Sequence, residues 1–120
     1  MQKILYIEDD ALNLRLVRKM LKTLDYDMIE VRNGLDAARV ALYERPDVIL
    51  LDIQLLDISG LDVARELKSH PEMAHIPVIV VTADPSNYQA CQAAGCDGYL
   101  TKPLSRTSLL KTIVQFLPHA

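Results

Sequence analysis

The chain has few cysteines, no excess of positive charge and no long apolar segment, and each absence excludes a class of protein. Two cysteines, Cys91 and Cys96, are too few for a disulfide framework, so we expect both to be reduced structural residues. The net charge of -3 argues against direct binding of nucleic acid, which usually goes with a basic excess. No apolar run approaches the roughly 18 residues of a membrane span, and the N-terminal residues lack the apolar core of a signal peptide. These features predict a cytoplasmic protein with no membrane or nucleic-acid partner.

The 120 residues fit one domain, and the chain shows no internal repeat, linker or low-complexity tract. Short apolar runs alternate with amphipathic segments along the chain, which is the signature of repeated strand–helix units. The runs are unbroken, as in a parallel sheet that helices cover on both faces. We therefore predict a single α/β domain over residues 1–120. The expected strands cover residues 4–7, 28–31, 48–51, 78–81 and 99–101.

Helix start and stop signals predict five helices between and after these strands. Asp10 is a candidate N-cap for the first helix, which we expect over residues 11–24. The second is expected to open at Asn33-Gly34 and to run through Tyr43. The other signals are Ser59 with Asp62 for the third helix, Asp84-Pro85 and Gly95 for the start and end of the fourth, and Ser105 and Pro118 for the fifth.

The strands end on polar residues, and these ends carry the functional signal. Glu8 and Asp9 follow the first strand, Asp52 the third, Thr82 the fourth and Lys102 the fifth. In a doubly wound parallel sheet, ligands bind beyond the carboxyl ends of the strands, where the strand order reverses. In the common order 2-1-3-4-5 this point lies between the first and third strands. We therefore expect Glu8 and Asp9 to lie beside Asp52.

Carboxylates gathered at one place need a positive partner. Two carboxylates about 4 Å apart repel each other by on the order of 4 kcal/mol at a surface-like dielectric constant. Mg2+ suits such a site, because it binds through one or two carboxylates, water and phosphoryl oxygens. An aspartate in this setting can attack phosphorus and form an acyl phosphate. Asp52, at the end of a buried strand, is the candidate nucleophile, with Lys102 and the Thr82 hydroxyl placed to hold the transferred group.

Five short motifs, in this order and at these spacings, make the chain resemble the receiver domain of two-component response regulators over essentially all 120 residues. They are Ile-Glu-Asp-Asp after the first strand, Leu-Leu-Asp-Ile-Gln around Asp52, Gly60 at the third helix, Val-Thr-Ala at Thr82, and Tyr-Leu-Thr-Lys-Pro at the end of the fifth strand. The resemblance implies a CheY-like, flavodoxin-like doubly wound fold. Its five-stranded parallel sheet would have the order 2-1-3-4-5, with helices on both faces.

The resemblance also implies a phosphoacceptor site. Asp52 would accept a phosphoryl group from a histidine kinase or a histidine phosphotransfer protein. Asp9, Asp52 and the backbone carbonyl of Gln54 would bind Mg2+, and Glu8 would reach the ion through water. Lys102 would contact the phosphoryl group. The protein would not be an enzyme, although it would assist its own phosphorylation and dephosphorylation.

A conformational switch is the second implication of the resemblance. Thr82 and Lys102 would sense the phosphoryl group, and Tyr99 would turn into the space that Thr82 leaves. The surface of the fourth helix, fifth strand and fifth helix would then change its affinity for a downstream protein partner. Pro103 would follow a cis peptide bond. The chain, a stand-alone or an excised receiver, would act as a monomer or weak dimer.

Two features depart from the family pattern. Leu56 stands where the family commonly has proline, and we expect this to loosen the loop without altering the chemistry. The segment from Thr82 to Lys102 is short, so we expect the fourth helix, or the loop before it, to be trimmed.

Other interpretations stay open at this stage. Glu8 and Asp9 could be helix N-terminal acids that the helix dipole stabilises, and Tyr99 could serve packing alone. A flavin-binding domain would need a Ser-, Thr- or Gly-rich phosphate loop after the first strand, where this chain is acidic. A haloacid-dehalogenase-like phosphatase would carry Asp-x-Asp there. A degenerate receiver that only binds partners would lack some of these site residues. This chain has the acidic pair, Asp52, Thr82 and Lys102, which argues against that interpretation.

Overall fold

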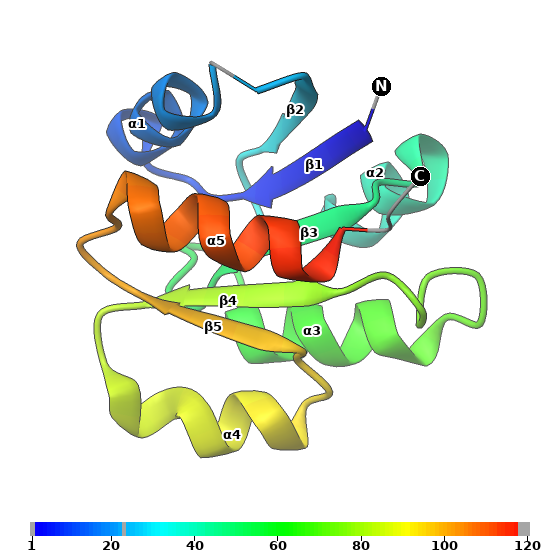
Figure 1. The fold of residues 1–120 in the computed structure, drawn as a ribbon. Helices are drawn as coiled ribbons and strands as arrows, with labels where there is room; N and C mark the ends of the chain where they lie inside the picture. Colours follow the sequence, from blue (N-terminus) through cyan, green and yellow to red (C-terminus); the bar gives the residue numbers. More distant parts are fainter. Residues whose placement is uncertain (1, 23, 118–120) are drawn as a thin grey trace.

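The computed structural model describes residues 2–22 and 24–117. Within these residues the chain forms one five-stranded parallel sheet in the order β2-β1-β3-β4-β5, flanked by five α-helices (Figure 1). The predicted fold class and strand order are confirmed. The strands are β1 (Gln2–Ile7), β2 (Tyr26–Val31), β3 (Val48–Asp52), β4 (Val78–Thr82) and β5 (Gly98–Thr101). The helices are α1 (Ala11–Leu21), α2 (Ala37–Glu44), α3 (Gly60–Ser69), α4 (Tyr88–Ala93) and α5 (Arg106–Phe116), with a 3-10 turn η1 (Pro85–Asn87) before α4.

Successive residues of the central strands pack on opposite faces of the sheet. Leu5 and Ile49 belong to a core shared with α2, α3 and α4. Tyr6 and Leu50, the next residue of each strand, belong to a second core shared with α1 and α5. All residues of β3 and β4 are buried, which explains why these runs are apolar without alternation. The sheet is thus held from both sides, and its strand ends are rigidly placed.

Three predicted caps fix the helices that start at the carboxyl edge of the sheet. The Asp10 carboxylate accepts a hydrogen bond from Leu12 N, and Ser59 Oγ accepts one from Leu61 N. Ser105 Oγ caps α5 by accepting a hydrogen bond from Ser108 N. Asp62 does not complete a capping box with Ser59, because its carboxylate pairs with Arg65 Nη1 at 2.8 Å.

Two helix boundaries differ from the prediction. The first helix ends at Leu21 rather than at residue 24, because Lys22 N and Leu24 N bond to carbonyls three residues back and tighten the chain into a turn. The second helix begins at Ala37 rather than at Asn33-Gly34. There, the Asn33 side chain accepts from Asp36 N and donates to the Asp36 carboxylate, which closes a local turn before the helix.

The expected fourth helix is divided into two parts. Asp84 caps its start, accepting from Ser86 N at 2.9 Å, but the first turn is the 3-10 turn η1. The α-helical part, α4, has only six residues, which agrees with the short segment noted in the sequence. The helix ends at Ala93, and Gly95 just beyond it has a left-handed φ of 95°. Cys96 N closes the turn onto the Cys91 carbonyl. Both cysteines are buried and free. Among the described residues, no helix is long and apolar enough to cross a membrane.

Candidate functional site

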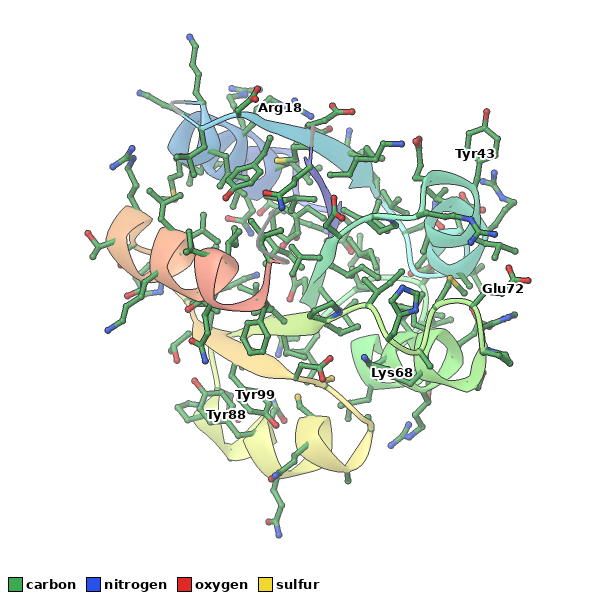
Figure 2. The ribbon with its side chains drawn as sticks, turned by 45° about the vertical axis from the view of Figure 1, so that its right-hand side comes forward. Arg18, Tyr43, Lys68, Glu72, Tyr88 and Tyr99 are labelled. Atoms are coloured by element: carbon green, nitrogen blue, oxygen red, sulfur yellow. The ribbon has the colours of Figure 1, made fainter. Side chains whose placement is uncertain are left out.

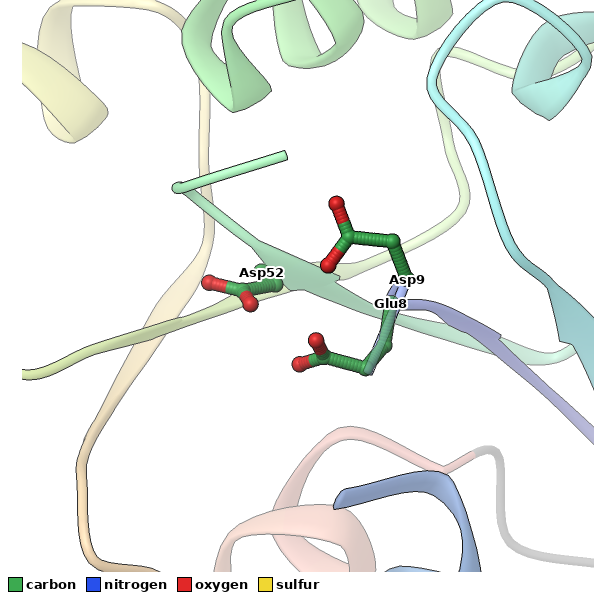
Figure 3. Close-up of side chains that lie close together, drawn as sticks. All are labelled: Glu8, Asp9 and Asp52. Atoms are coloured by element: carbon green, nitrogen blue, oxygen red, sulfur yellow. The ribbon is translucent and has the colours of Figure 1, made fainter. Parts of the chain in front are cut away.

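Three carboxylates converge at the carboxyl edge of β1 and β3 (Figure 3). Ile7 and Leu51 are partners in the β1–β3 register, so the residues that follow them emerge side by side. One carboxylate oxygen from each of Glu8, Asp9 and Asp52 lies within 4.8 Å of the others. Glu8 and Asp52 are almost fully buried, at 1% and 3% exposure. The predicted convergence of these acidic residues is therefore confirmed.

Lys102 supplies the positive charge of the site. Its Nζ donates to Asp52 Oδ2 at 2.9 Å and lies 3.5 Å from Glu8 Oε2. The residue is placed by the end of β5, where Lys102 N donates to the Thr82 carbonyl and the Lys102–Pro103 peptide bond is cis. Burial lowers the pKa of Lys102, but the hydrogen bond and charge of Asp52, together with Glu8, raise it overall. The lysine is therefore a firmly protonated partner for the carboxylates.

Glu8 is held in an unusual electrostatic environment. Burial and a hydrogen bond with Asp52 raise the pKa of Glu8 from 4.5 to about 7. Asp10 N donates to Glu8 Oε1 at 3.0 Å, and the Tyr6 hydroxyl lies 3.2 Å from Glu8 Oε2. Burial also raises the pKa of Tyr6 well above its usual range, so its hydroxyl stays a donor. Tyr6 was not foreseen from the sequence, although an aromatic residue two positions before Glu8, in an otherwise aliphatic run over residues 4–7, was a signal.

Backbone amides of the loop after β3 orient the other two carboxylates. Gln54 N donates to Asp52 Oδ1 at 3.0 Å, and Leu56 N donates to Asp9 Oδ2 at 2.7 Å. Proline at position 56 has no N–H and could not make the second bond. Asp57, in the same loop, accepts from Gly34 N and Leu35 N, each at 2.9 Å, and so ties this loop to the turn before α2. The expected loosening of this loop is thus not supported, whereas the role of the Gln54 carbonyl stays a prediction.

The hydroxyl of Thr82 is engaged in the turn that follows β4. Thr82 is buried, at 1% exposure, and its Oγ1 accepts from Asp84 N at 3.1 Å and from Asn87 Nδ2 at 3.2 Å. It also lies 3.4 Å from the Asp84 carbonyl, to which it donates. A phosphoryl group at Asp52 would have to compete with these partners for the Thr82 hydroxyl. Asn87 was not foreseen from the sequence.

Tyr99 lies on the surface between β5 and α4 (Figure 2). Its ring stacks on Tyr88, with the ring centroids 4.8 Å apart and the planes at 29°. The Tyr88 hydroxyl is hydrogen-bonded to the Thr101 hydroxyl. Tyr99 is half-buried, and this burial raises its pKa. Tyr88, which the sequence analysis did not single out, thus fixes the position of the Tyr99 ring.

Gly60 allows α3 to start directly against the end of β3. A Cβ atom at this position would lie 2.5 Å from Ile53 Cα and 2.6 Å from the Asp52 carbonyl oxygen. Gly60 N donates to the Ile53 carbonyl at 3.0 Å. The close approach leaves room only for glycine and fixes the backbone of Asp52.

Comparison with known proteins decides the family. Residues 4–114 match the family described as the response regulator receiver domain. The chain belongs to this family. The polar-differentiation response regulator DivK of Brucella anthropi is 40% identical over 121 residues, covering 99% of this chain and 98% of that protein. Family membership removes the flavin-binding and phosphatase alternatives, and the chain is a receiver rather than an enzyme.

Solved receiver structures have the same architecture. The receiver domain of the sensor histidine kinase PA1611 from Pseudomonas aeruginosa superimposes with a TM-score of 0.88 and 32% identity over 96% of both chains. That structure has a magnesium ion coordinated in its active-site cleft. The chemotaxis protein CheY4 of Vibrio cholerae gives a TM-score of 0.91 at 26% identity, covering 98% of this chain and 99% of CheY4.

The donor set of this receiver fits a hard divalent cation. The clustered ligand atoms of Glu8, Asp9 and Asp52 are all carboxylate oxygens, which Mg2+ prefers over nitrogen and sulfur donors. Backbone amides already orient all three carboxylates, so little ordering remains to be done on binding. Lys102 leaves part of the negative charge uncompensated, since one ammonium faces three carboxyl groups.

Proposed function

We propose that Asp52 accepts a phosphoryl group from a phosphohistidine, presented by a histidine kinase or a histidine phosphotransfer protein. The observation that carries this proposal is the setting of the Asp52 carboxylate. It is buried at the end of β3, it accepts from Lys102 Nζ at 2.9 Å, and it shares a cluster 4.8 Å across with Glu8 and Asp9. A structural ion pair would need one carboxylate for one ammonium, whereas Lys102 faces both Asp52 and Glu8, and Asp9 adds a third acid to the cluster.

The chain's own residues divide the work of phosphoryl transfer. An Asp52 oxygen attacks phosphorus while the bond from phosphorus to the histidine nitrogen breaks, and the imidazole keeps that electron pair and takes up a proton. Lys102 moves with the transferred group and holds one of its oxygens. Asp9, Asp52 and the Gln54 carbonyl would hold Mg2+, with Glu8 acting through water. When bound, the ion supplies the positive charge that screens the approaching phosphoryl group.

The output of the proposed function is a change in protein contacts. A phosphoryl group adds nearly two negative charges at Asp52 and offers oxygens that attract the Thr82 hydroxyl. Withdrawal of this hydroxyl from Asp84 and Asn87 would free space for the Tyr99 ring, which must then leave Tyr88. The surface of α4, β5 and α5 would change its affinity for a downstream protein partner.

The remaining features follow from the family and the sequence. We propose that residues 1–120 are a single receiver domain that acts in the cytoplasm as a monomer or weak dimer. Its partners would be proteins, with no direct contact to nucleic acid or membrane.

Intact-mass spectrometry after incubation with acetyl phosphate and Mg2+ tests the proposal. We expect one phosphoryl adduct that is stable in acid and labile in base, and that is absent with EDTA or in Asp52→Asn. Asp62→Asn is the matched control, because Asp62 is an exposed acid on α3, and it should be labelled like the wild type. An adduct that survives Asp52→Asn would show that another residue is the acceptor. A degenerate receiver would give no adduct at all.

A further inference from the structure

Two large leucines are exposed on loops that hydrogen bonds connect to the acidic cluster. Leu56, in the loop after β3, is 92% exposed, and Leu35, in the turn before α2, is 69% exposed. We call these two residues the rim leucines. Single exposed leucines are common on protein surfaces, so their number alone carries no argument. Their position carries the argument, because hydrogen bonds tie the Leu56 loop to Asp9 and the Leu35 loop to Asp57.

The position of Leu56 is set by the site itself. Its backbone N–H donates to Asp9 Oδ2 at 2.7 Å, and Asp9 shares the carboxylate cluster with Asp52. The backbone of Leu56 therefore lies one contact away from the proposed acceptor cluster, while its side chain is almost fully in water. A family-typical proline would offer a smaller side chain here and no N–H.

Leu35 is tied to the same loop through Asp57. The Asp57 carboxylate accepts from Leu35 N and from Gly34 N, each at 2.9 Å. These bonds lower the pKa of Asp57, so the carboxylate stays ionised and keeps both donors. Asp57 is the neighbour of Leu56 in the chain. The two rim leucines are thus presented by two different loops that one carboxylate joins.

We propose that the rim leucines are a docking surface for the phosphohistidine-bearing protein, which meets them with apolar side chains next to its histidine. The proposal rests on the proposed function. Direct transfer needs the phosphorus within about 3.5 Å of the Asp52 oxygen, so the donor protein must contact the mouth of the site. An interface of ordinary size buries about 800 Å2 on each partner, a disc of roughly 16 Å radius. A donor centred on Asp52 therefore covers Leu56 and buries apolar area that is otherwise in water.

The test compares a protein donor with a small one. The variants are Leu35→Ser, Leu56→Ser and the double variant, and the control is Tyr43→Ser. Tyr43 is 86% exposed on α2, next to Glu44, whose carbonyl contacts Lys3 at the opposite edge of the sheet (Figure 2). The protein donor is an autophosphorylated histidine kinase, chosen from purified kinases of the source organism as the one that labels the wild type fastest. The small donor is phosphoramidate.

The readout is the ratio of kcat/KM for the kinase to the rate constant for phosphoramidate. We expect this ratio to fall about tenfold in the double variant, which corresponds to about 1.4 kcal/mol, with each single variant giving part of the loss. The Tyr43→Ser ratio should equal that of the wild type. Because a defect in the chemistry lowers both rates, the ratio isolates docking.

Three results would overturn the docking surface. The first is an unchanged ratio in the double variant. The second is an unchanged ratio together with weakened self-association in sedimentation, which would assign the rim leucines to contact between two copies of the chain. The third is that phosphoramidate labels the wild type but none of the purified kinases does. Failure of the proposed function looks different, since phosphoramidate would then not label Asp52 in the wild type.

Discussion

Replacement of Glu8 by glutamine removes a buried carboxyl group of the site whose pKa the fold raises. Burial, with a hydrogen bond to Asp52, raises this pKa from 4.5 to about 7. Between these two pH values the folded protein binds more protons at Glu8 than the unfolded chain does, so the free energy of unfolding falls as pH rises through this window. One pKa unit is worth about 1.4 kcal/mol, so the ionised Glu8 costs about 3 kcal/mol above the window.

Urea unfolding in EDTA measures this cost. The free energies of unfolding of wild type and Glu8→Gln are compared at about pH 5 and at about pH 8. Most of the titration of Glu8 in the folded protein falls between these two pH values. Glutamine has only one side-chain oxygen, so it cannot accept from both Tyr6 and Asp10 as the two carboxylate oxygens of Glu8 do. The free energy lost with this hydrogen bond is the same at both pH values. It therefore cancels when the change between the two pH values is compared. We expect the wild type to lose roughly 2 to 3 kcal/mol more than Glu8→Gln on going to the higher pH, because most of the titration lies between these pH values.

Mg2+ should reduce this dependence on pH. A saturating concentration of Mg2+ favours the ionised carboxylates, so the difference between wild type and Glu8→Gln should shrink when EDTA is replaced by Mg2+. Parallel pH dependences of the two proteins in EDTA would refute the argument, because they would show that Glu8 is ionised equally easily in the folded and unfolded states.

Three further perturbations address the cation, the switch and the packing of the site. Lys102→Met should bind Mg2+ more tightly in calorimetry, because the ammonium no longer competes for Asp52. The same variant should be labelled by acetyl phosphate more slowly, on the order of tenfold or more. Equal Mg2+ affinities of the variant and the wild type would contradict this. In protein labelled with 3-fluorotyrosine, the fluorine resonance of Tyr99, assigned with Tyr99→Phe, should shift when beryllofluoride and Mg2+ are added, and a fixed resonance would count against its role in the switch. Gly60→Ala should lower the free energy of unfolding by about 2 kcal/mol in urea titrations, because the new Cβ would lie 2.5 Å from a backbone atom; an unchanged midpoint would show that α3 shifts freely.

The fold and the acidic cluster were predictable because they depend on strand ends. Unbroken apolar runs that stop at Glu8 and Asp52 place those residues at one edge of any parallel sheet in this order. The caps at Asp10 and Ser59 were predictable for a similar reason, since each acts on its own helix. Local pattern and strand order together were enough for these features.

Contacts between loops were not predictable in this way. The bond from Leu56 N to Asp9 joins positions 47 residues apart, and the Asp57 carboxylate reaches Leu35 across 22 residues. Nothing in the local sequence at Leu56 shows that its backbone N–H has a partner. The presence of leucine where the family commonly has proline therefore suggested only a looser loop. The Tyr88–Tyr99 stack depends likewise on how α4 sits against β5.

The identity of the acceptor is tested most directly by trapping it chemically. Borohydride reduces an aspartyl phosphate to homoserine with loss of phosphate, and tandem mass spectrometry of the digested protein then locates the homoserine. After treatment with acetyl phosphate and Mg2+, the account predicts homoserine at position 52 and nowhere else. Homoserine at position 9, or at any other aspartate in place of Asp52, would contradict it.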